Sequence, residues 1–458
     1  MPNPTHTEII DSYANQWKLN GGAVFVRSAL ATEWQPCSPD PAGNWEYLLA
    51  DRVGFVWVAG PAGLCRLAPH SHEDGWQEPH SSDLPSAEIT ALSNSPDGLI
   101  MVGYATGDVV DVDIDDEGKS LVRKRIAASS PVRELDVDAD GRIIVTTVTG
   151  REVMPSDEDA WQRSWQELAR LPGGNHDLFA IDVDGELWMA GGLTHGLGYP
   201  PQMHVFDEVF AYNPSSDAWR VVDRMPFPRC YSGIAELEGD VWIVGGAANL
   251  GDPDNPRGER EPLDDVRVYS PSRERDGSDA WRAGPSLNHA RLEPVVQGVN
   301  QRIWVIGGTD GDPMAHVESI GVDEEEWRVE TPLPWVQNQA GGCVLDGQVY
   351  CVSRNGFLRL DPETGQWDAD LLQLDPSPQA AQVAAYDGKV WVMGGSRRKD
   401  THIFDPKTES WEVGPDLPTD NSWGAALDLG GRLVVAGGAH WSERHQRYYF
   451  DDRLIALR

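Results

Sequence analysis

The sequence predicts an all-β protein built from repeated four-stranded antiparallel sheets, and three observations support this. Glycine (47), proline (33) and tryptophan (19) are abundant among the 458 residues, as in chains whose short aromatic strands are joined by many turns. A short apolar strand ending in Gly-Gly recurs through the second half of the chain. A further strand, a turn and a Trp follow each copy.

The first repeated element is a turn containing glycine, an apolar strand and a pair of glycines. The glycine pair permits close backbone approach where a sheet is crowded. Clear copies are Gly185–Gly192, Gly239–Gly246, Gln301–Gly308, Gly388–Gly395 and Gly431–Gly438. A degenerate copy, Gly347–Arg354, lacks the pair, so we expect its sheet to deviate from the others.

The second repeated element is a strand, a tight turn and a Trp. The copies are Phe210–Trp219, Leu360–Trp367 and Phe404–Trp411, with variants at Tyr269–Trp281 and Ile320–Trp327. Four strands in each unit of about 40–50 residues is the spacing of a β-propeller. Packing the sheets radially buries both apolar faces of each sheet, and we expect the Trp side chains to fill the wedges between them.

These motifs resemble the kelch-repeat family, and the resemblance covers about Asp177–Arg458 in six units. It implies a propeller fold. Kelch proteins often act as interaction platforms, so the resemblance also implies that one face could bind a partner.

The first third of the chain carries a different repeat. Residues Asp51–Leu67 resemble the propeller repeat of periplasmic two-component sensors, and weaker copies occupy Pro96–Gly107 and Ala139–Gly150. Adding these units to the six others predicts a single closed ring of seven to nine blades.

Ring closure needs a strand from elsewhere in the chain, because the last unit ends at Arg458 after its third strand. We expect the N-terminal segment that contains Trp17 or Ala23–Trp34 to supply it. The predicted organisation is one propeller over 1–458. Within it, 1–45 forms the closing strand and lead-in, 46–170 the non-kelch repeats and 171–458 the kelch-type repeats.

The composition limits the partners of the protein. Asp and Glu total 73 against 37 Lys and Arg, a formal net charge of −36, which repels nucleic acid and anionic membranes. Either a high-salt environment or a GC-rich genome accounts for a surface this acidic and poor in lysine.

No apolar stretch is long enough to span a membrane. The five cysteines form no CxxC pair and, being odd in number, suggest no disulfide framework. The N-terminus lacks the pattern of a signal peptide, so a cytoplasmic location is expected.

Two sets of residues lead into the innermost strands at fixed places in the six units. Aligned on Trp188 and its equivalents, the first set lies thirteen residues earlier: Asn175, Arg229, Arg291, Gln337, Pro378 and Asn421. The second lies eleven residues earlier: Asp177, Tyr231, Glu293, Gln339, Ala380 and Trp423. In a propeller these loops surround the central channel, so the large polar and aromatic side chains predict a binding funnel. The alternative is that the Arg and Asn side chains only satisfy loop carbonyls.

The leading functional hypothesis is a ligand-binding funnel, with enzymatic action on a carbohydrate or another small anionic compound. His289 or His176 with Tyr231 would form the acid–base pair of a lyase or isomerase. Arg229 and Arg291 would hold a substrate carboxylate as bidentate donors. The remaining predicted substrate-binding residues are Asn175, Glu293, Gln337, Gln339, Asn421, Trp423 and His440.

The long loops after the glycine pairs are expected on the same face. They supply the candidate ligands of a divalent metal, which are His195, His204, His440 and His445. No HxH or HxxxH spacing supports a metal site locally, and no other cofactor is predicted.

The alternative hypothesis is a non-enzymatic scaffold that grips a protein partner with this same face. Aromatic side chains suit such a role because they anchor protein interfaces. The candidates are Trp423, Trp441, Tyr199, Tyr448 and Tyr449.

Overall fold

A computed structural model describes most of the chain in sixteen segments. These are residues 8–11, 15–28, 31–39, 44–51, 55–61, 63–67, 75–78, 84–94, 100–114, 120–137, 143–154, 164–197, 202–248, 261–275, 279–442 and 447–458. Antiparallel strands make up nearly all of the regular structure in these segments, beside the short helix α2 (Pro271–Arg275). The predicted all-β class with four-stranded antiparallel sheets is therefore confirmed.

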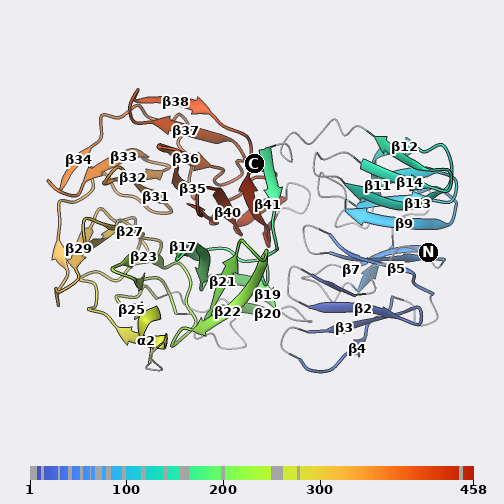
Figure 1. The fold of residues 1–458 in the computed structure, drawn as a ribbon, viewed down its shortest axis with the longest axis horizontal. Coiled ribbons are helices and arrows are strands. Elements are labelled where there is room, and N and C mark those ends of the chain that lie inside the picture. The colour runs from blue at the N-terminus through green and yellow to red at the C-terminus, as the bar shows by residue number, and fades with distance from the viewer. Residues whose placement is uncertain are drawn as a thin grey trace.

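Six four-stranded sheets follow one another in the C-terminal part, arranged around a common centre (Figure 1). The first is β17 (Phe179–Val183), β18 (Glu186–Ala190), β21 (Glu208–Asn213) and β22 (Ala218–Arg224). The second is β23 (Gly233–Leu237), β24 (Asp240–Val244), β25 (Val266–Tyr269) and β26 (Trp281–Ala283). The third is β27 (Val295–Val299), β28 (Arg302–Ile306), β29 (Val317–Gly321) and β30 (Arg328–Val329).

The fourth sheet is complete although its repeat lacks the glycine pair. It consists of β31 (Gly341–Leu345), β32 (Gln348–Ser353), β33 (Gly356–Asp361) and β34 (Gln366–Asp368). Ser353 pairs directly with Gly356, so a tight turn replaces the long loop of the other sheets. The deviation expected of the fourth sheet is thus confined to this loop.

The fifth sheet is β35 (Gln382–Tyr386), β36 (Lys389–Met393), β37 (Thr401–Asp405) and β38 (Ser410–Val413).

The sixth sheet corrects the prediction of a closing strand from the N-terminus. Its order is β39 (Ala425–Asp428), β40 (Leu433–Ala436), β43 (Leu454–Leu457) and β16 (Trp165–Glu167). Trp165 pairs with Leu457, and its indole Nε1 donates to the Asp416 carbonyl at 3.0 Å. The outer strand therefore comes from the segment just before the first kelch-type unit, and the expected strand at Trp17 or Ala23–Trp34 was wrong.

The physical reason is that Trp165 occupies the repeated Trp position. In five of the six sheets the outer-strand Trp ties its sheet to the connection leaving the previous sheet, whereas Trp281 of the second sheet donates to Asp223 Oδ2 on β22 at 3.0 Å. The indole nitrogens of Trp219, Trp327, Trp367 and Trp411 donate to the carbonyls of Ala169, Pro285, Thr331 and Leu372 at 2.8–3.1 Å. Trp165 makes the same bond for the sixth sheet. The predicted role of these Trp side chains, packed between neighbouring sheets, is confirmed.

Four further sheets come from the N-terminal part, where the predicted strand regions of Asp51–Leu67, Pro96–Gly107 and Ala139–Gly150 all lie. The first contains β1 (Glu8–Ile10), β2 (Gln16–Asn20), β3 (Ala23–Arg27) and β4 (Gln35–Pro36). The second contains β5 (Tyr47–Ala50), β6 (Val56–Gly60), β7 (Gly63–Leu67) and β8 (Trp76–Gln77). The third contains β9 (Ile89–Asn94), β10 (Ile100–Tyr104), β11 (Asp108–Ile114) and β12 (Ser120–Ala127). The fourth has three strands, β13 (Val132–Val137), β14 (Ile143–Thr147) and β15 (Arg151–Met154).

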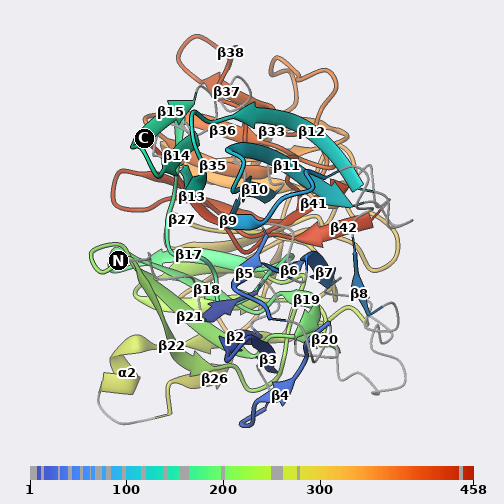
Figure 2. The same cartoon turned by 90° about the vertical axis from the view of Figure 1, so that its right-hand side faces the viewer.

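The number of sheets around the centre differs from the predicted seven to nine. The inner strands contact one another in the order β17, β23, β27, β31, β35 and β39, and β39 contacts β17 again. The N-terminal sheets form a second group beside these six (Figure 1), and they face the viewer in Figure 2. Six sheets therefore surround the centre that the candidate site residues approach.

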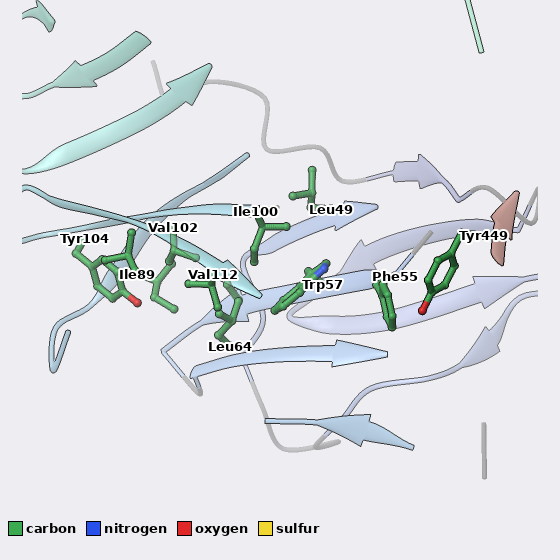
Figure 3. Packing of buried hydrophobic residues seen from close by; sticks show 12 residues of the cluster. Leu49, Phe55, Trp57, Leu64, Ile89, Ile100, Val102, Tyr104, Val112 and Tyr449 are labelled. Atoms are coloured by element: carbon green, nitrogen blue, oxygen red, sulfur yellow. The ribbon is translucent and has the colours of Figure 1, made fainter. Parts of the chain in front are cut away.

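Two hairpins extend from the first and sixth sheets, formed by β19 (Leu193–Leu197) with β20 (Gln202–Val205) and by β41 (Ala439–Ser442) with β42 (Arg447–Phe450). Tyr449 of β42 joins an apolar cluster of the N-terminal sheets, with its ring 6.0 Å from that of Phe55 (Figure 3). None of the five cysteines forms a disulfide bond. Within the described residues, no helix has the length and apolar character needed to cross a membrane.

Candidate functional site

The first predicted set of residues holds the glycine turns. The side-chain amides of Asn175 and Asn421 donate to the carbonyls of Gly191 and Gly437 at 3.0 and 2.9 Å. Arg229 and Arg291 donate likewise to Gly245 and Gly307, at 3.3 and 3.1 Å. In every case the acceptor is the first glycine of the pair, sixteen residues further along. This matches the alternative considered for the set, in which Arg and Asn satisfy loop carbonyls.

The two arginines are buried and paired. Arg229 is 1 % exposed and Arg291 is 0 % exposed. Arg229 pairs with Asp265, and Arg291 pairs with the fully buried Glu318. Burial lowers the pKa of both guanidinium groups, and the paired carboxylates oppose that shift. Neither arginine lines the central cavity, so neither is placed to hold a substrate carboxylate there.

The other two members of the first set donate to no glycine turn. Pro378 has no side-chain donor, although its sheet keeps the pair Gly394-Gly395. Gln337 precedes the sheet that lacks a glycine pair, and its buried side-chain amide has no hydrogen-bond partner among the described residues. The anchor and the turn that it would hold are therefore lost together in the fourth sheet.

The second set forms a ring around the centre. Asp177, Tyr231, Glu293, Gln339, Ala380 and Trp423 all have positive φ values, between 49° and 58°. In four cases the backbone N–H of one member donates to the backbone carbonyl of its neighbour in the ring. The donor and acceptor residues are Asp177 and Trp423, Glu293 and Tyr231, Ala380 and Gln339, and Trp423 and Ala380, at 2.8–3.1 Å. Non-glycine residues enter this region of φ at some cost, and here the cost recurs six times.

All six members of this ring line one cavity of about 220 Å³. The start of each inner strand supplies the rest of its wall. Among the described residues of that wall, none is Lys, Arg or His. Asp177 and Glu293 are its carboxylates, and the Gln339 amide donates to Glu293 Oε1 at 3.3 Å. The cavity is therefore acidic, which does not favour the predicted small anionic compound.

The predicted acid–base partners are not all brought together. Tyr231 is part of the cavity wall, whereas His176 and His289 are not. His176 is largely buried, contacts Asp177, and packs 4.1 Å from the Phe450 ring. The His289 ring stacks on His316 at 3.9 Å, with its Nδ1 3.3 Å from Glu318.

The metal-ligand candidates lie in different surroundings. His204 packs against Phe206 at 4.9 Å and lies 3.8 Å from Glu208. His440 is buried against Tyr449, and burial lowers its pKa to about 4. The structure does not describe the side chain of His195. The metal-ligand candidate His445 and the predicted contact residue Tyr199 both lie outside the described residues. Among the side chains that are described, no group of three or more His, Cys, Asp or Glu could hold a metal ion.

An aromatic ledge extends from the cavity rim, and sequence reasoning had singled out its residues only one by one. It consists of Trp423, Tyr448 and Trp441. The rings of Trp423 and Tyr448 lie 5.3 Å apart, and those of Trp441 and Tyr448 lie 5.0 Å apart, both edge to face. All three are partly exposed. Arg397 lies over Trp441 at 4.2 Å.

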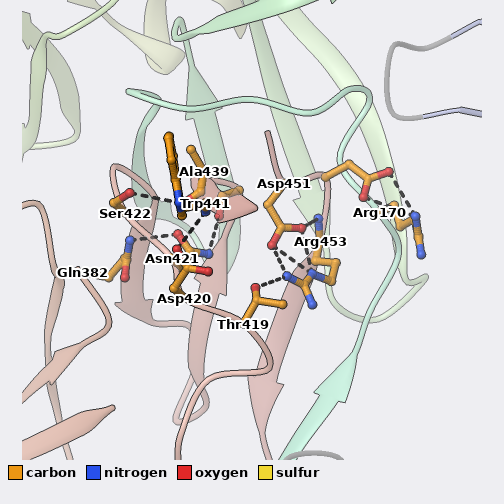
Figure 4. A network of polar contacts seen from close by, with 12 residues as sticks. Arg170, Gln382, Thr419, Asp420, Asn421, Ser422, Ala439, Trp441, Asp451 and Arg453 are labelled. Atoms are coloured by element: carbon orange, nitrogen blue, oxygen red, sulfur yellow. Dashed lines mark hydrogen bonds and ion pairs between the residues drawn. The ribbon is translucent and has the colours of Figure 1, made fainter. Parts of the chain in front are cut away.

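A buried polar network supports the sixth sheet beside this ledge (Figure 4). Arg453 pairs with Asp451 and donates to Thr419 Oγ1 at 2.7 Å. The backbone N–H of Trp441 donates to Asp420 Oδ2 at 2.8 Å. The hairpin that presents the ledge is thereby fixed to the loop that precedes Trp423.

Comparison with known proteins points to one type of repeat. The family described as Kelch motif matches residues 380–418. Kelch-like protein 25 of Xenopus tropicalis is 24 % identical, over 55 % of this chain and 42 % of that protein. Kelch-like protein 35 of Mus musculus is 26 % identical, over 55 % and 41 %. Beta-scruin of Limulus polyphemus is 25 % identical, over 52 % and 22 %.

The chain thus spans less than half the length of these curated relatives. Among solved structures, "Structure of YjhT" is similar with a TM-score of 0.49 and 14 % identity, covering 63 % of this chain and 96 % of that one.

Proposed function

We propose that this chain, whose repeats are similar to the Kelch motif and to kelch-like proteins, is a protein-interaction scaffold that binds a partner through the face carrying the cavity rim. The second set of residues carries this proposal. Six equivalent backbone positions hold Asp, Tyr, Glu, Gln, Ala and Trp, so the fold fixes their placement while their chemistry varies. Such variation on a rigid frame is typical of binding surfaces.

The aromatic ledge supports the same function. Partly exposed Trp and Tyr side chains at the centre of a face are the usual anchors of protein interfaces. Trp423 belongs to both the rim and the ledge, so a partner that covers the rim also contacts aromatic surface.

We propose further that the six sheets form a closed ring that keeps this face rigid. Two hydrogen bonds between the sixth and first units support closure: from Gly438 N to Asn175 O at 2.8 Å, and from Asp177 N to Trp423 O at 2.9 Å. No comparable observation favours a lyase or isomerase, because the predicted arginines and histidines do not line the cavity.

A random peptide library displayed on phage tests the scaffold function. We expect peptides to be enriched on the purified protein and to lose binding to Trp423→Ala, since that change removes the side chain shared by rim and ledge. Val221→Ala, which shortens a side chain that is 57 % exposed on the outer strand of the first sheet, is the control and should retain binding. Equal enrichment on all three proteins, or none on the wild type, contradicts the proposal.

A further inference from the structure

The cavity at the centre of the six sheets has chemistry that suits a cation. Its wall contains Asp177 and Glu293, which come from the first and third units. The Asp177 carboxylate also contacts the His176 ring behind the wall, so Glu293 is the more available of the two carboxylates. No described residue of the wall carries a positive charge at neutral pH. Low-dielectric walls concentrate the field of such groups within a concave site.

Aromatic side chains add to this preference. Tyr231 and Trp423 both line the cavity. The face of an aromatic ring attracts ammonium and guanidinium groups, and Trp attracts them most strongly. The amide of Gln339, hydrogen-bonded to Glu293, supplies a neutral polar group beside the carboxylate.

The size of the cavity limits what enters it. At about 220 Å³, it is smaller than the roughly 300–1,000 Å³ of ordinary small-molecule sites. A cavity of that volume holds one long side chain, and it is too small for a nucleotide or an oligosaccharide. The rest of a larger ligand would remain outside, where the aromatic ledge of Trp423, Tyr448 and Trp441 offers contact area.

We infer that this cavity receives a single Arg or Lys side chain from an extended segment of a partner protein, while the neighbouring residues of that segment pack on the aromatic ledge. This inference rests on the proposed scaffold function. It is also the opposite of an anionic ligand, which the two carboxylates would repel. The net charge of −36 attracts basic partners from a distance, whereas the cavity selects the inserted residue.

The test measures binding of octapeptide pools to the purified 458-residue chain. Each pool has one fixed central residue, and all its other positions are mixed. We expect the Arg and Lys pools to bind at least about tenfold more tightly than the Gln pool, because the carboxylates interact with charge as well as with hydrogen-bond donors. The Glu pool should bind weakest. Glu293→Gln should weaken the Arg pool by about tenfold, since it removes one of the cavity's two charges.

Glu238→Gln is the matched control. It makes the same change in net charge at an exposed turn at the far end of β23, so it should change binding by less than about twofold. Asp177→Asn is a second variant in the cavity, for use if Glu293→Gln fails to fold, with thermal melting as the check on folding.

The outcomes separate the two proposals. If no pool binds, both the scaffold function and the cation site are wrong. If pools bind without preference for a basic centre, or prefer an acidic one, the cation site is wrong and the scaffold stands. If Glu293→Gln and Glu238→Gln weaken binding equally, long-range charge explains the preference and the cavity does not.

Discussion

At the scale of single residues, the structure separates two columns that lie only two positions apart in the sequence. The Asn and Arg of the first column turn inward and donate to the glycine turns, and burial of Arg229 and Arg291 follows from that role. The Asp, Tyr, Glu, Gln, Ala and Trp of the second column surround the cavity. Their positive φ values show that the backbone reverses at this point, which is why neighbours in the sequence have such different environments.

Arg291→Met tests the structural role of the first column. The change leaves Glu318 buried without its main partner and removes one donor from each of three carbonyls, those of His289, Gly307 and His316. We expect the free energy of unfolding to fall by about 3 kcal/mol, as when one partner of a buried ion pair is removed. Urea denaturation measures it.

The control for this change is Arg220→Met, whose partner Glu186 forms a half-exposed pair. It should cost about 1 kcal/mol or less. Equal stability of Arg291→Met and the wild type would show that Arg291 is not a structural anchor.

We expect His440 to make the free energy of unfolding depend on pH. Its folded pKa of about 4 lies below the ordinary value of 6.5 because burial disfavours the charged ring. The unfolded chain therefore gains the proton first, and stability falls as the pH drops from about 6.5 to 4, by up to about 3 kcal/mol. Below that window this group contributes no further loss.

Chemical denaturation at pH 7 and pH 4, with wild type and His440→Gln compared, measures this effect. The wild type should lose more stability than the variant between the two pH values, since the variant has no ring to protonate. Identical losses would mean that His440 is not the group responsible.

At the scale of elements, the outer-strand Trp is the feature that defines each sheet. Trp165, Trp219, Trp281, Trp327 and Trp411 are each followed six residues later by Leu or Met. Trp165 with Leu171 fits this spacing, so the sequence held a signal for the true outer strand of the sixth sheet. It was missed because the strand lies before the first unit, and its partner Asp416 is 251 residues away.

The glycine pairs allow a matched test within one sheet. Gly239 and Gly246 lie at the two ends of β24, with φ values of +82° and +90°. A Cβ on Gly239 meets nothing within 4 Å, whereas on Gly246 it would lie 2.5 Å from the Cys230 carbonyl oxygen.

We therefore expect Gly239→Ala to cost about 1 kcal/mol from backbone strain alone. Gly246→Ala should cost about 3 kcal/mol or more, because overpacking adds to the strain. Thermal unfolding of the two variants provides the comparison, and equal losses would rule out the close approach as the reason for the second glycine.

At the scale of the whole molecule, two features bear on stability: the net charge, and the contact between the six C-terminal sheets and the N-terminal sheets. The net charge of −36 is spread over one chain, so self-repulsion opposes the compact state. The hairpin β41–β42 connects the sixth sheet to the N-terminal sheets through Tyr449 and Phe55. The same hairpin carries Trp441 and Tyr448, so the aromatic ledge and this internal contact share one element.

Salt should stabilise the protein. Raising NaCl from about 0.05 to 1 M shortens the screening length from roughly 14 to 3 Å, which weakens the repulsion among carboxylates. We expect the thermal midpoint to rise over this range. Sodium chloride and sodium sulfate at equal ionic strength should both raise it, and a midpoint that falls in NaCl would show that attractive ion pairs outweigh the repulsion.

The sequence by itself determined the all-β class and the six kelch-type units, because these follow from local repeats of strand, turn, glycine pair and Trp. Only the tertiary structure decided that the inner strands of six sheets contact one another in turn, that Trp165 supplies the outer strand of the last sheet, and that Arg229 and Arg291 donate to glycine carbonyls outside the cavity wall. Those outcomes depend on pairing between distant segments and on the direction of each side chain at a backbone reversal. Neither is encoded in the spacing of a repeat.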